Sequence, residues 1–304
     1  MRGKQMSRDW ETVLRSWSNP PSNSEEQRCE NADRMVRDAI TKFGGFQTRK
    51  VDTIPQGSYN NNTNVRLNSD VDICVRSTDT FFYELPQGMT KEQSGISEAT
   101  YHYPQFKNEV ETALVDKFGR TAVKRGNKAF DIDENTYHIA IDIVACFEYR
   151  YYYKNSNNTL DYISGVKFIS DDGRETINYP RQHHEKGVSK NNATNYRFKY
   201  MVRGLKRLRN EMADNGVTAA KTIPSYLIEC LVWNCPNTSF CHTTYLDDMK
   251  SILAYSYDST RSQEQCKGWC EINDIKYLFH WTQPWTQNQA HDFLSAAWDY
   301  IGFN

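Results

Sequence analysis

The sequence of 304 residues lacks any long apolar run. A membrane-spanning helix needs about 18 consecutive apolar residues, and no stretch of the chain approaches this length. The first residues, MRGKQMSRDWETVL, lack the apolar core of a signal peptide, so we expect a cytoplasmic protein. An excess of positive charge is also missing, with 37 Lys and Arg against 38 Asp and Glu. This balance argues against a dedicated binder of duplex nucleic acid, although it still allows a local basic groove.

Cysteine pairs with the spacing of a metal site are also lacking. The chain has eight cysteines but no C-x-x-C pair, and Cys266 and Cys270 fit no common zinc spacing. Cys74 and Cys146 lie in apolar, strand-like runs, where a thiol behaves as a small hydrophobic group. We therefore expect reduced thiols with packing roles.

The length and composition predict a folded protein with two lobes. Aromatic residues make up 13% of the chain, and 304 residues suffice for two hydrophobic cores. We expect an α/β lobe at 1–150 and a mostly helical lobe at 151–304, with the active site in the cleft between them. The expected elements are a helix at 24–43, strands at 48–54 and 71–76, a helix at 103–118, a hairpin of 123–132 with 137–147, polar loops at 155–194, and helices at 196–212, 225–233, 245–255 and 287–300.

One stretch, QGSYNNNTNVRLNSDVDICV at residues 56–75, places two aspartates on an apolar strand. Because side chains alternate along a strand, Asp70 and Asp72 face one side while Val71 and Ile73 face a core. Carboxylates this close repel each other, and a divalent ion such as Mg²⁺, which prefers oxygen ligands, would offset the repulsion. A solvated strand end is the alternative interpretation of a D-x-D pair taken alone.

A third carboxylate, Asp142, stands alone in the apolar run IAIDIV. A carboxylate is rarely buried without a partner, so we expect Asp142 on a neighbouring strand, where it shares the metal with Asp70 and Asp72. A second D-x-D pair, Asp131 and Asp133, borders a predicted turn and follows no Gly-Ser pair. We interpret this second pair as turn chemistry.

Gly57 and Ser58 supply the other half of the predicted site. A glycine lets the backbone approach a ligand closely, and exposed N–H groups at a helix start bind anions. The Ser58 hydroxyl can donate a hydrogen bond to a phosphate oxygen. A Gly-Ser turn, a D-x-D strand and a later Asp on an apolar strand together form a specific pattern.

The order Gly57-Ser58, Asp70-Val-Asp72, Asp142 resembles the signature of the polymerase-β-like nucleotidyltransferase superfamily. The wider string is similar to that of the bacterial cGAS/DncV-like nucleotidyltransferases, nearest the subgroup that includes pyrimidine-using members. The likeness extends to residues 128–147, INYPRQHHEKG and IPSYLIE. It implies a mixed-sheet catalytic lobe followed by a helical lobe, and synthesis of cyclic oligonucleotide second messengers for anti-phage signalling.

The helix predicted at 196–212 has a basic stripe. Lys199, Arg203 and Lys206 fall in one sector of this helix, opposite an apolar face. A solvated charged face is the alternative, but opposite an acidic metal site we interpret the stripe as a triphosphate clamp. The resemblance places one lysine of this helix on the donor triphosphate; Lys206 is the best match, and Lys199 and Arg203 are further candidates.

Four more residues are assigned to the nucleotide through the resemblance. It places Ser225 on the triphosphate, Tyr226 on the base and Asn178 near a base edge, and Gln56 precedes the Gly-Ser turn. Ser225 also suits an N-cap with a hydroxyl for phosphate, and Tyr226 offers a stacking surface for any base. For Tyr226 a packed core aromatic is the alternative.

The resemblance implies that Asp70, Asp72 and Asp142 hold two Mg²⁺ ions, with Mn²⁺ as an alternative. A ribose hydroxyl attacks the donor α-phosphate, pyrophosphate leaves, and a linear intermediate closes into a cyclic di- or trinucleotide. Asp142 is the expected helper in deprotonating the hydroxyl. The chemistry needs no histidine, so His183 and His184 receive no direct role.

The expected substrates are ATP and UTP, with GTP as a third candidate, and a downstream effector would respond to the cyclic product. We expect a monomer without membrane attachment. The DNA-binding insertion of animal relatives has no counterpart here, so we expect no activation by duplex DNA. The alternatives are a nucleotidyltransferase for a small molecule or an RNA end, a linear oligonucleotide synthase, and a nucleotide sensor without catalysis, which the presence of all three aspartates argues against.

Overall fold

A computed structural model describes residues 8–65 and 70–303. The chain forms two compact units, each with its own hydrophobic core. The sheet unit contains Ser22–Asn60 and Arg66–Arg181, and the helical unit contains Met1–Pro21, Asn61–Val65 and Gln182–Asn304. The chain therefore passes between the units several times, whereas a single division between residues 150 and 151 was expected.

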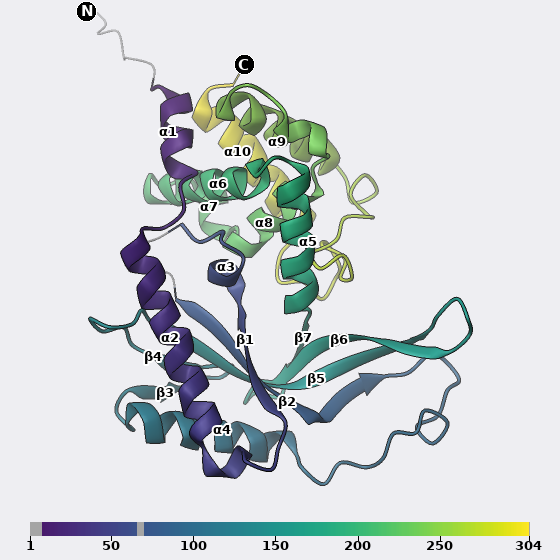
Figure 1. Ribbon diagram of the computed structural model, residues 1–304. Coiled ribbons are helices and arrows are strands. Elements are labelled where there is room, and N and C mark those ends of the chain that lie inside the picture. The colour runs from purple at the N-terminus through teal and green to yellow at the C-terminus, as the bar shows by residue number, and fades with distance from the viewer. Residues whose placement is uncertain (1–7, 66–69, 304) are drawn as a thin grey trace, which may run out of the picture. The chain divides into compact units, whose positions relative to one another are not determined.

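The described part of the sheet unit is built on one mixed, seven-stranded sheet (Figure 1). The strands follow the order β1-β2-β5-β4-β3, while β6 pairs with the second half of β5 and β7 pairs with β6. The β2–β5 pairing is parallel and the other pairings are antiparallel. The strands are β1 Val51–Gln56, β2 Val71–Glu84, β3 Val123–Arg125, β4 Phe130–Ile132, β5 Ile141–Lys154, β6 Leu160–Ile169 and β7 Glu175–Asn178.

Two helices pack against one face of this sheet, α2 (Asn23–Lys42) and α4 (Tyr103–Phe118). Val36 of α2 and Phe106 of α4 are fully buried with Ile73 of β2 and Ile143 of β5. Because strand residues alternate between faces, the residues between these buried positions point to the opposite face. A 3₁₀ turn at Gly44–Phe46 and the short helix α3 (Gly57–Asn60) complete the unit.

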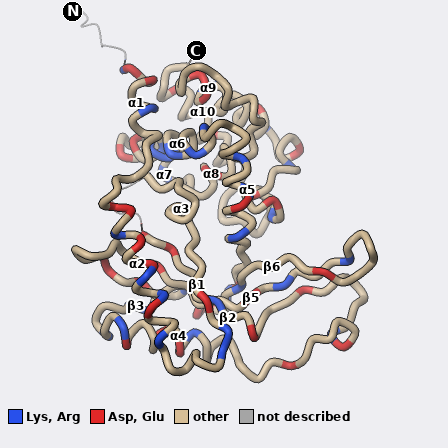
Figure 2. Tube along the Cα trace, in the orientation of Figure 1, with Lys and Arg blue, Asp and Glu red and all other residues tan. Residues whose placement is uncertain are grey.

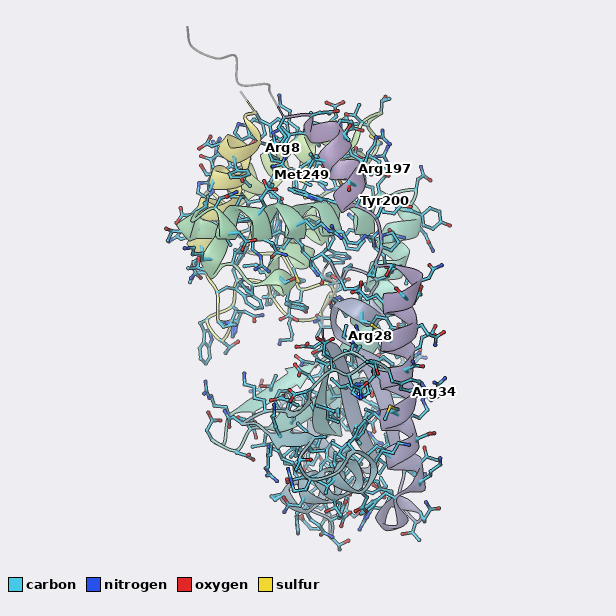
Figure 3. The ribbon with its side chains drawn as sticks, turned by 90° about the vertical axis from the view of Figure 1, so that its left-hand side faces the viewer. Arg8, Arg28, Arg34, Arg197, Tyr200 and Met249 are labelled. Atoms are coloured by element: carbon cyan, nitrogen blue, oxygen red, sulfur yellow. The ribbon has the colours of Figure 1, made fainter. Side chains whose placement is uncertain are left out.

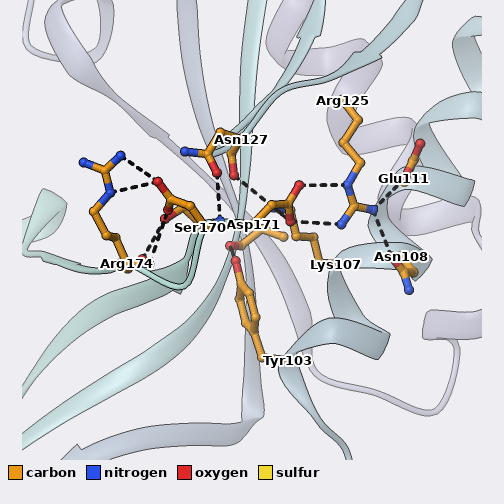
Figure 4. A network of polar contacts seen from close by, with 11 residues as sticks. Tyr103, Lys107, Asn108, Glu111, Arg125, Asn127, Ser170, Asp171 and Arg174 are labelled. Carbon is orange, nitrogen blue, oxygen red and sulfur yellow. Dashed lines mark hydrogen bonds and ion pairs between the residues drawn. The ribbon is translucent and has the colours of Figure 1, made fainter.

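A polar network ties α4 to the β3–β4 hairpin and to the turn between β6 and β7 (Figure 4). Asp171 in that turn accepts hydrogen bonds from Arg125, at 3.2 Å, and from Lys107 Nζ, at 2.7 Å. Arg125 also donates to Glu111 of α4, at 2.8 Å. These hydrogen bonds from Arg125 and Lys107 lower the pKa of Asp171 to about 2.

The helical unit has a core built around α6, whose Phe198, Val202 and Leu205 are buried with Leu227 and Leu231 of α8. Among the described residues, no helix combines the length and apolar character needed to cross a membrane. The helices of this unit, and of the junction leading into it, are α1 Trp10–Trp17, α5 Pro180–Ala193, α6 Arg197–Asp214, α7 Thr218–Thr222, α8 Ser225–Asn234, the 3₁₀ helix Asn237–Phe240, α9 Tyr245–Ser259 and α10 Gln287–Ile301.

The helices predicted at 24–43, 103–118, 225–233 and 287–300 agree with the structure to within one residue. The prediction of polar loops over 155–194 is wrong, because β6, β7 and α5 occupy most of this range. The predicted hairpin of 123–132 with 137–147 is confirmed only in part, because residues 130–132 pair antiparallel with 141–143 whereas 123–125 do not belong to the same strand. Residues 123–125 and 130–132 pair with each other, and β4 then pairs with β5 across a loop of eight residues, 133–140.

Candidate active site

Four polar side chains form one row across the sheet. Gln56 on β1 is paired in register with Asp72 on β2, Asp72 with Asp142 on β5, and Asp142 with Asp131 on β4. Residues paired in this way lie on the same face of a sheet, with neighbouring strands about 4.8 Å apart. The prediction that Asp142 lies on a strand next to Asp72 is confirmed.

Asp70 lies on the same side as Asp72, two residues earlier in the chain, and Val71 and Ile73 are fully buried on the other side, as predicted. Burial, and the negative charges of Asp131 and Glu134, raise the pKa of Asp70. Burial, and the charges of Asp70 and Asp131, raise the pKa of Asp142 to about 6. Burial is the larger cause of both pKa shifts, and the neighbouring negative charges add to it. Among the described residues no Lys or Arg pairs with Asp70, Asp131 or Asp142.

The chemistry of this row fits a divalent cation. It offers carboxylate oxygens on adjacent strands, which are the donors that Mg²⁺ prefers. In the described residues, however, no group of three or more His, Cys, Asp or Glu side chains converges in a preformed metal-binding arrangement. The assignment of Mg²⁺ to Asp70, Asp72 and Asp142 therefore stays a prediction.

Gly57 stands directly against this row. Its φ is +70°, and a Cβ atom added there would lie only 1.9 Å from Asp72 Oδ2. A larger residue at this position would force the Asp72 carboxylate to move, because Cβ atoms essentially never approach other atoms so closely. The Gly-Ser turn and the aspartate strand, predicted separately from the sequence, thus meet at Gly57 and Asp72, with Ser58 as the next residue in α3.

Asp131 is the site residue that the sequence did not reveal. We predicted turn chemistry for it, but it lies in the middle of β4, opposite Asp142. The negative charge of Asp131 also helps to raise the pKa of Asp142. The sequence carries a weak signal, because the apolar Phe130 and Ile132 on either side of Asp131 alternate as in a strand, over too few residues to distinguish a strand from a turn.

The loop that leads into Asp142 is pinned to α2. Arg28 donates hydrogen bonds to Glu134, at 2.7 Å, and to the carbonyl of Asn135, at 2.8 Å. Asn31 Nδ2 donates to the carbonyl of Tyr137, at 2.9 Å. Figure 3 shows Arg28 on α2. These contacts fix the chain between β4 and β5, and so the ends of the strands that carry the carboxylates.

Asn178 lies on the carboxylate face but far from the row. It pairs with Val166 of β6, which pairs with Glu148 of β5. Glu148 follows Asp142 by six residues, which corresponds to roughly 20 Å along the strand. The structure thus places Asn178 on the carboxylate face without bringing it to the carboxylates, and its predicted role in reading a base stays a prediction.

The three cations of the predicted basic stripe lie on α6, in the helical unit, but two of them are buried. Figure 2 shows Lys and Arg along α6. Arg203 and Lys206 are not presented to solvent, with 2% and 1% of their surface exposed, so the prediction of an open stripe is wrong for both. Lys199 is only half-buried, and among the described residues its ammonium group has no hydrogen-bonding or ion-pair partner. Burial, and repulsion from Arg203, lower the pKa of Lys199.

Lys206 forms a buried ion pair with Glu229 of α8. Burial alone would raise the pKa of Glu229, but the charges of Lys206 and His183 outweigh it and hold this pKa at about 2. His183 Nε2 lies 3.7 Å from Glu229 Oε2. The predicted contact of Lys206 with a triphosphate would have to compete with this pair.

Ser225 and Tyr226 open α8. The expectation that Ser225 caps this helix is wrong, since Pro224 is the N-cap residue and Ser225 is the first helical residue. The Tyr226 hydroxyl donates to Glu271, at 2.9 Å, and its ring centroid lies 5.6 Å from that of His183. The ring is therefore held in a fixed orientation, and its predicted stacking on a base is untested.

Comparison with known proteins connects these features to one family. Residues 185–302 match the family described as "cGAS/DncV-like nucleotidyltransferase C-terminal helical domain". The chain is 41% identical to the cyclic dipyrimidine nucleotide synthase CdnE of Cecembia lonarensis, over 98% of this chain and 100% of the relative. It is 43% identical to the protein of the same name from Legionella pneumophila, with the same coverage.

A solved structure shares the whole fold. The Rhodothermus marinus CdnE c-UMP-AMP synthase, determined with Apcpp and Upnpp, is 29% identical, and the match covers 97% of each chain with a TM-score of 0.85. The predicted fold, an α/β nucleotidyltransferase lobe with a helical lobe, is confirmed by this likeness.

Proposed function

The chain belongs to the cGAS/DncV-like nucleotidyltransferases, and from this premise we propose that it joins nucleoside triphosphates into a cyclic di- or trinucleotide and releases pyrophosphate. The product would serve as a second messenger in anti-phage signalling. The observation that carries the proposal is the row of Asp72, Asp142 and Asp131 on adjacent strands, with Gly57 in contact with Asp72.

The carboxylate row has the chemistry for phosphoryl transfer. Bound at Asp70, Asp72 and Asp142, Mg²⁺ would neutralise charge on the triphosphate and lower the pKa of the attacking hydroxyl. Asp142 stands in the middle of the row and is our candidate to accept the proton of the acceptor ribose hydroxyl at a carboxylate oxygen. Ser58 follows Gly57 and would donate its hydroxyl hydrogen to a phosphate oxygen.

The helical unit would contribute binding groups. Lys199 is a half-buried cation without a partner among the described residues, which suits a phosphate oxygen. Tyr226, oriented through Glu271, would stack on a base. Catalysis of this kind depends mainly on the positions of the reacting groups and on the neutralisation of charge.

We propose that at least one substrate is a pyrimidine nucleotide, with UTP first and ATP as its partner. The names of the relatives support this choice, because they specify cyclic dipyrimidine and c-UMP-AMP products. GTP is a third candidate. Asn178, on the carboxylate face, is our candidate for reading a base edge, because an amide both donates and accepts hydrogen bonds.

The test is an incubation of the full chain with all four labelled nucleoside triphosphates and Mg²⁺, followed by phosphatase treatment and mass spectrometry. A phosphatase-resistant cyclic product supports the proposal and identifies the bases. A product that phosphatase degrades completely indicates a linear oligonucleotide synthase. Label transferred to an added RNA or small-molecule acceptor indicates the alternative transferase. The double variant Asp70→Ala, Asp72→Ala is the control and should form no product.

A further inference from the structure

The segment Asn61–Val65 belongs to the helical unit, although the chain on both sides of it belongs to the sheet unit. It follows α3, which begins with Gly57 and Ser58, and the chain reaches Asp70 five residues after it ends. Thr63 and Asn64 are buried, with 1% and 4% of their surface exposed. Residues 61–65, which lie between the two predicted catalytic motifs, are therefore held inside the helical unit.

A buried ion pair holds the centre of this segment. Lys206 Nζ donates to the carbonyl oxygen of Thr63, at 3.1 Å, and pairs with Glu229. Glu229 Oε1 accepts a hydrogen bond from Thr63 Oγ1, at 2.9 Å. One residue of the segment thus uses both its backbone and its side chain on a charged pair that is sealed from solvent.

A second buried cation holds the preceding residue. Arg203 donates from one terminal nitrogen to the carbonyl of Asn62, at 2.6 Å, and from Nε to the carbonyl of Ser18, at 2.7 Å. Two of the three cations in the predicted basic stripe are therefore bound to backbone carbonyls and a carboxylate inside the helical unit.

These contacts leave Lys206 little capacity for a phosphate. Its ammonium group has three hydrogens, and a carbonyl and a carboxylate already take two of them. Moving Lys206 to a triphosphate would leave the charge of Glu229 buried without its strongest partner, which is costly. Lys199, on the same helix, has no such partner among the described residues.

We propose that Lys206 and Glu229 are positioning residues that hold Thr63, so that Ser58 on one side and Asp70 on the other keep their catalytic positions. This inference rests on the proposed function. It assigns the phosphate-binding role on α6 to Lys199 and an internal role to Lys206, although both are lysines on the same helix.

The experiment compares variants of the full chain by steady-state pyrophosphate release and by hydrogen–deuterium exchange. The anchor variants are Lys206→Met, Glu229→Gln and Thr63→Val, which loses only the hydroxyl. Thr63→Ser retains the hydroxyl and is the conservative rescue. Lys199→Met tests the phosphate-binding role, and Lys221→Met, at an exposed position of α7, is the surface control.

We expect the three anchor variants to lower kcat on the order of 10- to 100-fold with little change in KM, because misplaced reacting groups lose rate rather than binding. Thr63→Ser and Lys221→Met should resemble the wild type. Lys199→Met should instead raise KM. In the anchor variants, amides of residues 57–65 and 70–72 should exchange faster, while amides of α10 keep their protection; a merely structural role would accelerate exchange throughout the helical unit.

The inference is overturned if Lys206→Met raises KM as Lys199→Met does while Glu229→Gln and Thr63→Val keep wild-type kcat. It is also overturned if exchange at 57–65 is unchanged in the anchor variants. If Lys206→Met does not fold, the comparison of Thr63→Val with Thr63→Ser decides the question. Should the wild-type chain form no product at all, the proposed function fails, and the exchange experiment still tests the anchor by itself.

Discussion

Charged side chains are arranged in opposite ways in the two units. In the sheet unit, Asp72, Asp142 and Asp131 occupy adjacent positions on three strands, and all carry the same sign. In the helical unit, the buried carboxylate of Glu229 has the buried ammonium of Lys206 against it. The pKa of Asp142 rises to about 6, whereas that of Glu229 falls to about 2.

The two carboxylates differ in their neighbours, because Glu229 is neutralised by Lys206 within the protein whereas Asp142 faces other carboxylates. Burial disfavours the charged form of both carboxylates, so the sign of the neighbouring charge decides the direction of each shift. Glu229 already has its counter-charge and can act only inside the protein. Asp142 and Asp131 have no Lys or Arg partner among the described residues, and a divalent ion would supply the missing positive charge.

The largest effect is expected from removing charge in the row. Asp142→Asn or Asp72→Asn should lower nucleotide turnover by at least about 10³-fold, because metal binding contributes several kcal/mol to the transition state. Thermal unfolding should show that both variants fold. Asp133→Asn, in the second D-x-D pair and paired on the surface with Lys124, is the matched control and should keep wild-type turnover. Turnover near wild type in Asp142→Asn would contradict the assignment of the row.

The next largest effect is expected at Gly57. Gly57→Ala would force a Cβ atom into Asp72 Oδ2, and the displaced carboxylate should cost on the order of 100-fold in kcat. Gly88→Ala is a matched control, because Gly88 also has a positive φ, of +81°, but no atom within 4 Å of the added Cβ. Equal losses of activity in the two variants would show that backbone strain, not the contact with Asp72, is responsible.

The pH dependence of stability is expected to show a smaller effect. It tests the aspartate row without an activity assay. The pKa of Asp142 is raised from 3.8 to about 6 in the folded protein. Its stabilising contribution to the free energy of unfolding is therefore fully present below about pH 4 and is lost as the pH rises through 6. Wild-type protein in EDTA should therefore lose a few degrees of Tm between pH 4 and 7, since 1 kcal/mol corresponds to about 2–4 °C at this size. Thermal scans of Asp142→Asn should show a smaller loss, because the raised pKa of Asp70 remains and acts in the same direction.

Glu229 cannot produce the same trend. The pKa of Glu229 is lowered in the folded protein. Glu229 therefore stabilises the fold at any pH above the usual pKa of a glutamate, and this stabilisation is lost only as the pH falls toward about 2. An Asp142→Asn protein that loses as much Tm between pH 4 and 7 as the wild type would contradict the pKa shift assigned to Asp142.

The smallest effect is expected at Asp171, which is paired with cations in the same unit as the aspartate row. Asp171→Asn removes partners of Lys107 and Arg125 at a partly exposed position, so urea unfolding at pH 7 should show a loss of no more than about 1 kcal/mol. Turnover should not change. A large loss of turnover would show that the network of Figure 4 does more than tie α4 to the strands.

Local periodicity was enough to predict much of the site. Asp70 and Asp72 share a face because strand side chains alternate, and Asp142 had to meet a partner because a lone carboxylate is costly in an apolar strand. Asp131 was missed because a strand of three residues gives too short a pattern to distinguish from a turn. Residues 155–194 were missed because polar strands such as β6 form through pairing with β5, which is distant in the chain.

The sequence by itself determined the face that carries the aspartates, the Gly-Ser turn and the family, because these depend on residue types at short, regular spacing. Only the tertiary structure decided that Lys206 has an ion-pair partner whereas Lys199 has none among the described residues. Lys199 and Lys206 are the same residue type on the same helix, and spacing does not distinguish them. They differ because Thr63 and Glu229, far apart in the chain, meet at Lys206 and exclude water there.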